Sequence, residues 1–313
     1  MPTGAPTLRQ SAQDWRWGRR PLPPASVADS AVVPATWQFP TRWVRSRPAA
    51  AARAGIQAGM LGPLLRSQLR IEVRGVERLL DHAAQGPMIL APNHTSHLDA
   101  PLVLTSLPPE VRRDTVTLAA SDYFFDAWWR AAATSLVFNA APVDRVSGGS
   151  QSLAEQLLGD GHPLLLFPEG TRSHDGYAGR FRGGAAHLGR RAEVSIVPIA
   201  IEGTWRAMPR GQAWPTTGRP RVRISFGTPL HAGPGDTTLE LTRRLEAAIE
   251  VLLDEQRTDW WTSLRNQAAG TTPGLRGPDM APWRRRWALL EPGEDPHRDR
   301  VWHPRRPRRP RRP

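Results

Sequence analysis

Apolar runs alternate with helical stretches along the middle of this 313-residue chain, and this alternation limits the possible folds more than any other feature. The apolar runs are rich in Val, Ile, Leu and Phe, and helical segments such as Ser150 to Leu158 and Gly184 to Arg191 separate several of them. This order predicts an α/β fold with a mixed, largely parallel sheet flanked by helices. The expected strands are 71–73, 88–90, 115–119, 136–138, 164–167, 195–201 and 222–226.

Composition divides the chain into four parts. Residues 1–48 are an irregular arm rich in Pro, Arg and Trp. Residues 49–70 form an amphipathic helical segment that Pro63 bends or divides, and this segment either packs on the core or lies in a membrane interface. Residues 71–257 are the α/β domain, closed by a long helix that begins at Asp236 or Thr237. Residues 258–313 are a Trp/Arg/Pro-rich extension with a basic tail that is expected to be disordered.

Charge and cysteine content narrow the classes of function. The net charge is +13, and all 42 Lys and Arg residues are arginine, six of them between Arg305 and Arg312. Guanidinium groups bind phosphate and carboxylate, so a phosphate-rich partner is expected, with biased codon usage as the alternative explanation. The absence of Cys excludes disulfides and thiolate nucleophiles. No apolar run approaches the roughly 18 residues of a membrane span, so we expect a cytoplasmic protein, peripheral at the inner face of the cell membrane.

The stretch Pro92-Asn93-His94-Thr95-Ser96-His97-Leu98-Asp99 brings a histidine close to an aspartate. Imidazole titrates near neutral pH and a carboxylate fixes its tautomer, so His94 and Asp99 are candidates for removing a proton from an alcohol. On one regular helix, residues five apart would lie about 140° from each other, so His94 is expected in a loop. Pro101 favours a helix start between His97 and Ala100, which places Asp99 at the mouth of the helix.

Two other interpretations of this stretch stay open. Ser96 and Asp99 have the spacing of a capping box, in which case His94 is only a loop histidine. His94 and His97 could instead be zinc ligands, although no further ligand cluster is evident.

Three further stretches lie on or directly after expected strands, at Ala141 to Arg145, Phe167 to Ser173 and Ile196 to Ile199. Functional loops of an α/β sheet gather at the carboxyl ends of its strands. In the second of these stretches Gly170 permits close backbone approach, while Glu169 and Arg172 offer charges of both signs for a polar substrate. Pro198 removes a ladder hydrogen bond, which predicts a sheet edge, a bulge or the wall of a cavity.

In this order, the four stretches resemble the motifs of the glycerolipid acyltransferase family, and the resemblance covers about 71–226. The spacing of His94 and Asp99 corresponds to the family's His-x4-Asp motif, and the stretch Phe167 to Ser173 matches the third motif nearly letter for letter. Arg145 matches the arginine of the second motif, although the residues before it are smaller and stiffer than in the family. Val197-Pro198 matches the fourth motif.

The resemblance implies an O-acyltransferase that moves a fatty acyl group from acyl-CoA or acyl carrier protein to the free hydroxyl of 1-acylglycerol 3-phosphate, giving phosphatidic acid. In this mechanism His94 removes the hydroxyl proton and Asp99 holds the imidazole. The thioester donor is a co-substrate, and no cofactor or metal is expected. The implied acceptor site consists of five residues, of which the arginines bind the phosphate: Arg145, Glu169, Gly170, Thr171 and Arg172.

Two alternatives for the function remain. The same chemistry could act on another lysolipid or on an alcohol. Alternatively, the protein is non-catalytic and uses its Arg-rich ends to bind anionic membranes or nucleic acid, in which case binding would fall steeply with salt.

Overall fold

The computed structural model describes residues 41–120, 128–143, 149–281 and 284–285. Most of the N-terminal arm, Arg145 and the basic tail lie outside these described residues. The α/β domain and the segments that pack on it make up the described part of the chain.

The described residues form a seven-stranded sheet with the strand order β1-β7-β6-β2-β5-β3-β4. All neighbouring strands are parallel except β6 and β7, which are antiparallel. The expectation of a mixed, largely parallel sheet is therefore confirmed. The strands are β1 (Arg70–Arg74), β2 (Met88–Pro92), β3 (Val116–Ala120), β4 (Ala140–Val143), β5 (Leu164–Leu165), β6 (Ser195–Glu202) and β7 (Arg221–Phe226).

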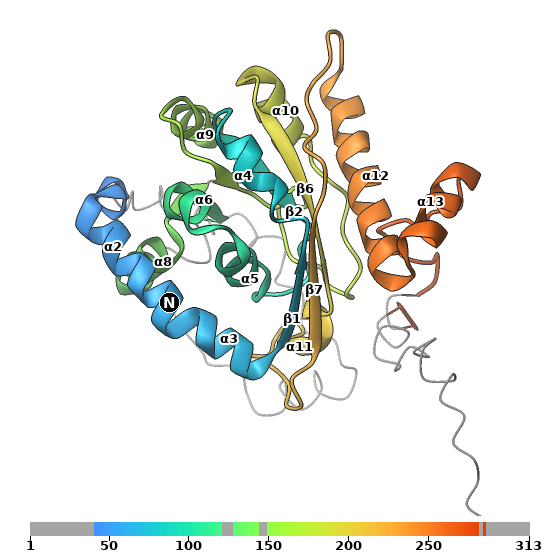
Figure 1. Cartoon of the computed structure of the whole chain (residues 1–313), viewed down its shortest axis with the longest axis horizontal. Coiled ribbons are helices and arrows are strands. Elements are labelled where there is room, and N and C mark those ends of the chain that lie inside the picture. Colours follow the sequence, from blue (N-terminus) through green and yellow to red (C-terminus); the bar gives the residue numbers. More distant parts are fainter. Residues whose placement is uncertain (1–40, 121–127, 144–148, 282–283, 286–313) are drawn as a thin grey trace, which may run out of the picture. The chain divides into compact units, whose positions relative to one another are not determined.

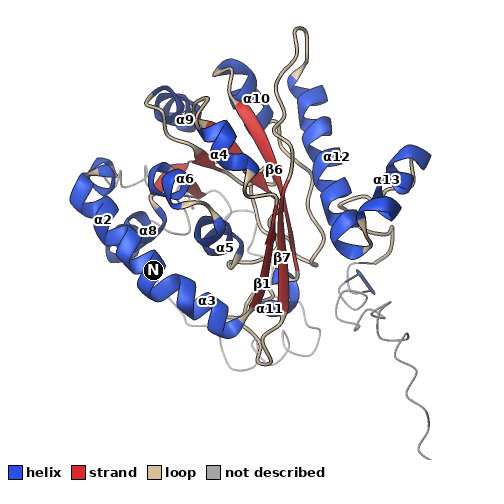
Figure 2. Ribbon diagram, in the orientation of Figure 1, coloured by secondary structure: helices blue, strands red, loops and turns tan. Residues whose placement is uncertain are grey.

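Helices cover both faces of the sheet (Figures 1 and 2). One apolar cluster joins the sheet to α3 (Gly62–Gln68), α4 (Arg78–Ala83), α5 (Asp99–Ser106) and α6 (Pro109–Asp114). The cluster on the opposite face contains side chains of α9 (Gly149–Gly159), α10 (Gly184–Arg191) and α12 (Thr238–Arg257). Every residue of β2 is buried, which explains why this strand appears in the sequence as a continuous apolar run.

One strand prediction is wrong. Residues 136–138 are the last residues of α8 (Trp128–Phe138), and the strand that follows is β4. Asn139 ends the helix in the left-handed region, with φ of 49°, and its Nδ2 donates a hydrogen bond to the carbonyl oxygen of Thr115 at 2.9 Å. A short apolar run has no periodicity that distinguishes the end of a buried helix from a strand, so the sequence pattern could not separate them.

The amphipathic segment forms three consecutive pieces, α2 (Arg47–Ile56), a π-helical turn η3 (Gln57–Leu61) and α3. Pro63 lies in the first turn of α3, directly after the π-helical turn, and the prediction that it bends or divides the segment stays a prediction. Two buried polar side chains fix the segment to the rest of the protein. Arg53 donates to the carbonyl oxygens of Val44 and Arg113, and Gln57 Nε2 donates to that of Val137.

The start and the end of the predicted domains need small corrections. A short 3-10 helix, η2 (Arg42–Arg45), and the first two residues of α2 already lie within the arm that was placed at 1–48. The extension after residue 257 begins with α13 (Trp260–Ala269), which the composition did not indicate. Asp259 caps α13 by accepting a hydrogen bond from Thr262 N at 3.0 Å.

Pro198 lies inside β6, at a gap in the pairing with β7. Its carbonyl oxygen accepts a hydrogen bond from Gly227 N at 2.9 Å, while regular pairing ends at Phe226 and resumes in an isolated bridge between Ile196 and Leu230. Pro198 also lines a cavity of about 390 Å³ beside α12. The predicted interruption and the predicted cavity wall are both present. The interruption lies within β6, and the cavity lies beside α12.

Among the helices that the structure describes, none combines the length and the apolar character needed to cross a bilayer.

Candidate active site

The first and third motifs follow neighbouring strands whose connections leave toward opposite faces of the sheet. β2 leads into α5, which packs in the same cluster as α3 and α4, whereas β5 leads toward α10 on the other face. Loops that diverge from adjacent parallel strands leave a crevice at the carboxyl ends of those strands. The topology therefore places the two motifs side by side.

His94 and Asp99 form a direct pair at this edge. His94 Nδ1 lies 2.9 Å from Asp99 Oδ2, and the helix α5 begins at Asp99, as expected from Pro101. The same oxygen accepts hydrogen bonds from Thr95 N at 2.7 Å and Ser96 N at 2.8 Å. The Asp99 side chain is 0% exposed and that of His94 is 17% exposed. A carboxylate that accepts from Nδ1–H leaves Nε2 as the basic nitrogen of the imidazole.

Only one of the two hydrogen bonds of a capping box is present between Ser96 and Asp99, the bond from Ser96 N to Asp99 Oδ2. In a capping box Ser96 Oγ would accept a hydrogen bond from the backbone of Asp99. In the structure this hydroxyl donates to the carbonyl oxygen of Met208 at 2.8 Å, and Asp99 N donates instead to the carbonyl oxygen of Ser96. Ser96 therefore ties the histidine loop to the segment after β6.

Two residues of the third motif form hydrogen bonds with the backbone of His94, one with its amide and one with its carbonyl oxygen. His94 N donates to Glu169 Oε1 at 2.7 Å, and the carbonyl oxygen of His94 accepts from Ser173 N at 2.9 Å. Phe167 stacks on the imidazole, with 3.8 Å between the ring centroids and 23° between the ring planes. These contacts fix the position and orientation of the ring.

Glu169, which accepts the hydrogen bond from His94 N, is buried and only 3% exposed. Its second carboxyl oxygen accepts a hydrogen bond from Gly179 N at 2.7 Å. Burial raises the pKa of Glu169 to about 8, against the opposing effect of the hydrogen bonds from Gly179 and His94. The geometry makes Glu169 a support for His94, and its expected part in the acceptor site stays a prediction.

Asn93 is a functional position that the sequence analysis left without a role. Its Nδ2 donates to the carbonyl oxygen of Ile201 at 3.0 Å, and its Oδ1 accepts from Ile201 N at 2.7 Å. The side-chain amide thus reproduces one peptide group and extends the pairing of β2 with β6 by one step. This holds the start of the histidine loop in line with the sheet, and an amide directly before the histidine was its only signal in the sequence.

The remaining residues of the third motif line the same region. Gly170 has φ of 69°, and a Cβ atom at this position would lie 3.1 Å from Arg182 Nε, so both backbone conformation and space favour glycine. Thr171 is exposed and Arg172 is half-buried. Burial, followed by the charge of Arg172, lowers the pKa of His97 to about 4, which places this arginine near the histidine loop.

The structure describes only part of the second motif. Arg145 lies outside the described residues, and β4 is described to Val143. In the strand order, β4 is three strands away from β2, which corresponds to about 14 Å across the sheet. The assignment of Arg145 to the phosphate stays a prediction.

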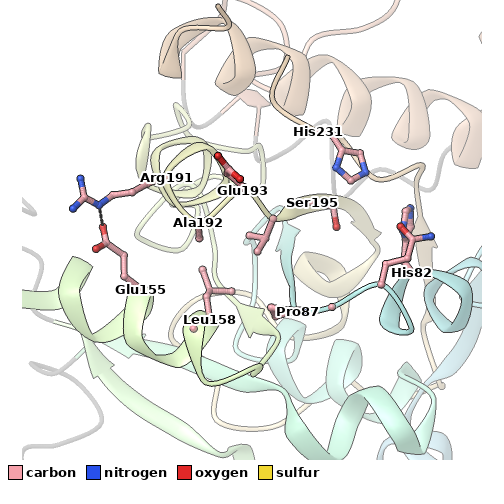
Figure 3. A pocket seen from close by; sticks show the side chains of 13 residues that line it. His82, Pro87, Glu155, Leu158, Arg191, Ala192, Glu193, Ser195 and His231 are labelled. Carbon is pink, nitrogen blue, oxygen red and sulfur yellow. Dashed lines mark hydrogen bonds and ion pairs between the residues drawn. The ribbon is translucent and has the colours of Figure 1, made fainter. Parts of the chain in front are cut away.

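A cavity of about 610 Å³ lies at the other end of the sheet (Figure 3). It is lined by residues near the amino ends of β2 and β6, among them His82, Ser195 and His231. An ion pair between Arg191 and Glu155, 2.8 Å long, lies at its side. Among the described residues that the sequence assigned to the site, none lines this cavity.

The described residues thus combine a largely parallel sheet with a histidine and aspartate pair beside a Glu-Gly-Thr-Arg loop, the arrangement on which the resemblance to acyltransferases depends. The family model described as Acyltransferase matches residues 70–202. Residues 70–202 therefore carry an acyltransferase domain, and the chain is similar to 1-acyl-sn-glycerol-3-phosphate acyltransferases.

Individual relatives show the extent of the similarity. The chain is 28% identical over 200 residues to 1-acyl-sn-glycerol-3-phosphate acyltransferase alpha of Ovis aries, covering 61% of this chain and 65% of that one. It is also 28% identical over 174 residues to the chloroplastic enzyme LPAT1 of Arabidopsis thaliana, covering 53% of this chain and 45% of that one. The matched region therefore spans less than two thirds of each of these relatives.

A solved structure has the same fold. It is the 1-acyl-sn-glycerophosphate (LPA) acyltransferase PlsC of Thermotoga maritima, with a TM-score of 0.55 and 20% sequence identity, covering 70% of this chain and 88% of that chain. At this identity the similarity establishes the α/β architecture alone.

Proposed function

We propose that this protein transfers a fatty acyl group from a thioester donor, acyl-CoA or acyl carrier protein, to the free hydroxyl of 1-acylglycerol 3-phosphate. One observation carries the proposal, namely the pairing of His94 Nδ1 with the buried carboxylate of Asp99 inside an acyltransferase family domain. This pairing leaves Nε2 of a partly exposed imidazole available to accept a proton.

In the proposed reaction, His94 Nε2 removes the proton from the acceptor hydroxyl as its oxygen attacks the thioester carbonyl. A new C–O bond forms, and the negative charge on the tetrahedral intermediate collapses to break the C–S bond. The imidazolium then returns its proton to the departing thiolate. Asp99 stabilises the imidazolium and keeps the ring in one tautomer, and no nucleophilic side chain is needed because the thiolate is a good leaving group.

The acceptor phosphate is assigned to Arg172 and Arg145. Arginine forms two parallel hydrogen bonds to phosphate, and Arg172 directly precedes Ser173, whose N donates to the carbonyl oxygen of His94. Gly170 and Thr171 would shape the acceptor pocket next to Arg172. The oxyanion would be stabilised by backbone amides or polar groups of the third motif, at about 3 kcal/mol per donor.

The product and its acceptor would both be membrane lipids, so the proposal includes peripheral association with the inner face of the cell membrane. Two features support this association. Met60 and Leu64 are large apolar side chains exposed on η3 and α3, and the sequence places six arginines between Arg305 and Arg312. Basic residues near an anionic leaflet add about 1 kcal/mol each to binding.

Assays of His94→Ala and Asp99→Asn test the proposal. We expect His94→Ala to abolish product formation from acyl-CoA and 1-acylglycerol 3-phosphate, and Asp99→Asn to lower kcat by about 100-fold or more, because general base catalysis is typically worth 10² to 10⁴ in rate. Product masses identify the lipid that is formed, and circular dichroism verifies folding. The control is His82→Ala, at the opposite end of the sheet, which should keep wild-type turnover.

Retained turnover in folded His94→Ala would refute the mechanism. A panel of lysolipids and alcohols, with and without phosphate, decides the acceptor in the same assay. Arg145→Ala should slow transfer only to acceptors that carry a phosphate. If alcohols and uncharged lysolipids react as well as the phosphate-bearing acceptor, the acceptor assignment is wrong while the chemistry stands.

A further inference from the structure

The described segment after α13 returns to the loop that carries the third motif. This segment, residues 271–281 with 284–285, is named the C-terminal brace, and it lies outside the matched family domain. Leu275 is its central contact: its carbonyl oxygen accepts a hydrogen bond from Ala178 N at 3.1 Å. The Leu275 side chain is 5% exposed and belongs to the same core cluster as Phe181.

Two more contacts join the brace to the same loop. Arg285 Nη2 forms an ion pair with Asp175 Oδ2 at 2.6 Å, and their side chains are 26% and 13% exposed. Gly277 lies directly against the ring of Tyr177, since a Cβ atom there would fall 2.4 Å from Tyr177 Cδ1. Gly277 also has φ of 67°, so backbone conformation and contact both favour glycine at this position.

The brace is itself anchored on the long helix α12. Leu275 N donates to Glu250 Oε1 at 3.0 Å, and Arg276 Nη2 lies 3.3 Å from Glu246 Oε1. α12 begins with a full capping box between Thr237 and Glu240 and packs along β6 and β7. The brace therefore connects α12 to the loop around residues 175–178, which has no regular secondary structure.

The loop that the brace contacts also forms hydrogen bonds with the backbone of His94. Gly179, next to the brace contact at Ala178, donates to Glu169, and Glu169 accepts from His94 N. Ser173, on the other side of Asp175, donates to the carbonyl oxygen of His94. Asp175 also accepts from Tyr177 N at 3.3 Å, so the ion-paired carboxylate is part of the folded loop.

We propose that the C-terminal brace is a positioning element for the acyl transfer, acting through Asp175, Glu169 and the backbone of His94. The inference rests on the proposed function for its kinetic consequence, but its structural part stands on the contacts of Leu275 and Arg285 alone. The contacts of Leu275, Gly277 and Arg285 fall on Ala178, Tyr177 and Asp175, so their loss should lower kcat and leave the KM for the thioester donor nearly unchanged.

Charge reversal in the full-length protein tests the brace. Arg285→Asp places like charges opposite each other, and we expect kcat to fall about 3- to 10-fold, which lies within the range that coupling between contacting residues produces. Arg285→Asp combined with Asp175→Arg restores opposite charges and should recover part of the loss. Arg191→Asp is the matched control, because it breaks an arginine–carboxylate pair of similar length at the other end of the sheet.

Hydrogen exchange measured by mass spectrometry gives a second readout that does not depend on turnover. Peptides covering residues 173–181 should exchange faster in Arg285→Asp than in the wild type, and slow again in the exchanged pair. If the wild type turns over and Arg285→Asp keeps its kcat and its loop exchange, the brace has no positioning role. If the wild type lacks acyltransferase activity, the proposed function fails and the exchange experiment alone decides whether the brace holds the loop.

Discussion

At the scale of single residues, one carboxylate oxygen of Asp99 accepts hydrogen bonds from three donors. His94 Nδ1, Thr95 N and Ser96 N all lie within 2.9 Å of Oδ2. The two amides fix the carboxylate before any substrate binds, and the carboxylate in turn fixes the imidazole. Hydrogen bonds to a charged acceptor are worth about 1.5 to 3 kcal/mol each, so the pair is held far more rigidly than a loop histidine alone.

His97 gives a prediction on pH. Burial and the charge of Arg172 lower its pKa to about 4 from the ordinary value of 6.5. Between these values the unfolded chain binds a proton at His97 that the folded protein does not bind. The unfolded chain is therefore favoured by protonation of His97. The free energy of unfolding is unaffected by this group above about pH 6.5 and decreases as the pH falls toward 4.

Urea unfolding of the wild type and His97→Gln at several pH values between 7 and 4 would measure this effect. We expect the free energy of unfolding of the wild type to fall more steeply with decreasing pH than that of the variant. The other histidines are common to both proteins, so the difference between the two curves isolates His97. Parallel curves throughout this range would contradict the assignment.

At the scale of elements, the segment α2–η3–α3 has two distinct faces. Arg53 and Gln57 are buried and bind carbonyl oxygens of neighbouring elements, whereas Met60 is 59% and Leu64 is 39% exposed. The two interpretations of this segment are therefore compatible, because one face packs on the protein while the other is open to a membrane interface.

The exposed face makes a testable prediction. Replacing Met60 and Leu64 together by Glu should weaken binding to lipid vesicles by about tenfold or more, since each apolar side chain contributes about 1.5 to 3 kcal/mol when buried. Sedimentation with vesicles measures the change. Leu80→Glu is the control, because Leu80 is a comparably exposed leucine on α4. Equal vesicle binding by the double variant and the wild type would exclude this face as the contact.

At the scale of the whole molecule, six of the arginines lie close together near the C-terminal end of the chain, between Arg305 and Arg312. Removing residues 298–313 deletes the arginine cluster between Arg305 and Arg312. We expect the truncated protein to bind anionic vesicles more weakly at low salt, with the difference disappearing at high salt and on neutral vesicles. Turnover of a detergent-dispersed acceptor should be unchanged, and loss of that turnover would show that the tail serves the site itself.

Much of the fold is encoded in patterns that short segments carry. The parallel strands β2 and β6 are continuous apolar runs, and α12 has a capping box at the residue where the sequence placed its start. The errors occur where local pattern is ambiguous, as in residues 136–138, or where a helix was not recognised, as in α13, although Asp259 caps its start and Gly270 its end. Boundaries of this kind are decided by neighbours that a local window does not contain.

The sequence by itself determined the α/β class and the local pairing of His94 with Asp99, because a loop and a helix start five residues apart need no distant partner. Only the tertiary structure decided that Glu169 accepts a hydrogen bond from His94 N, that Asn93 continues the pairing with β6, and that Leu275 contacts the loop that carries the third motif. The contact between His94 and Glu169 joins residues 75 positions apart, and that between Asn93 and Ile201 joins residues 108 positions apart. Such contacts form because the packed sheet and α12 bring those backbones within hydrogen-bonding distance, and no local pattern encodes that distance.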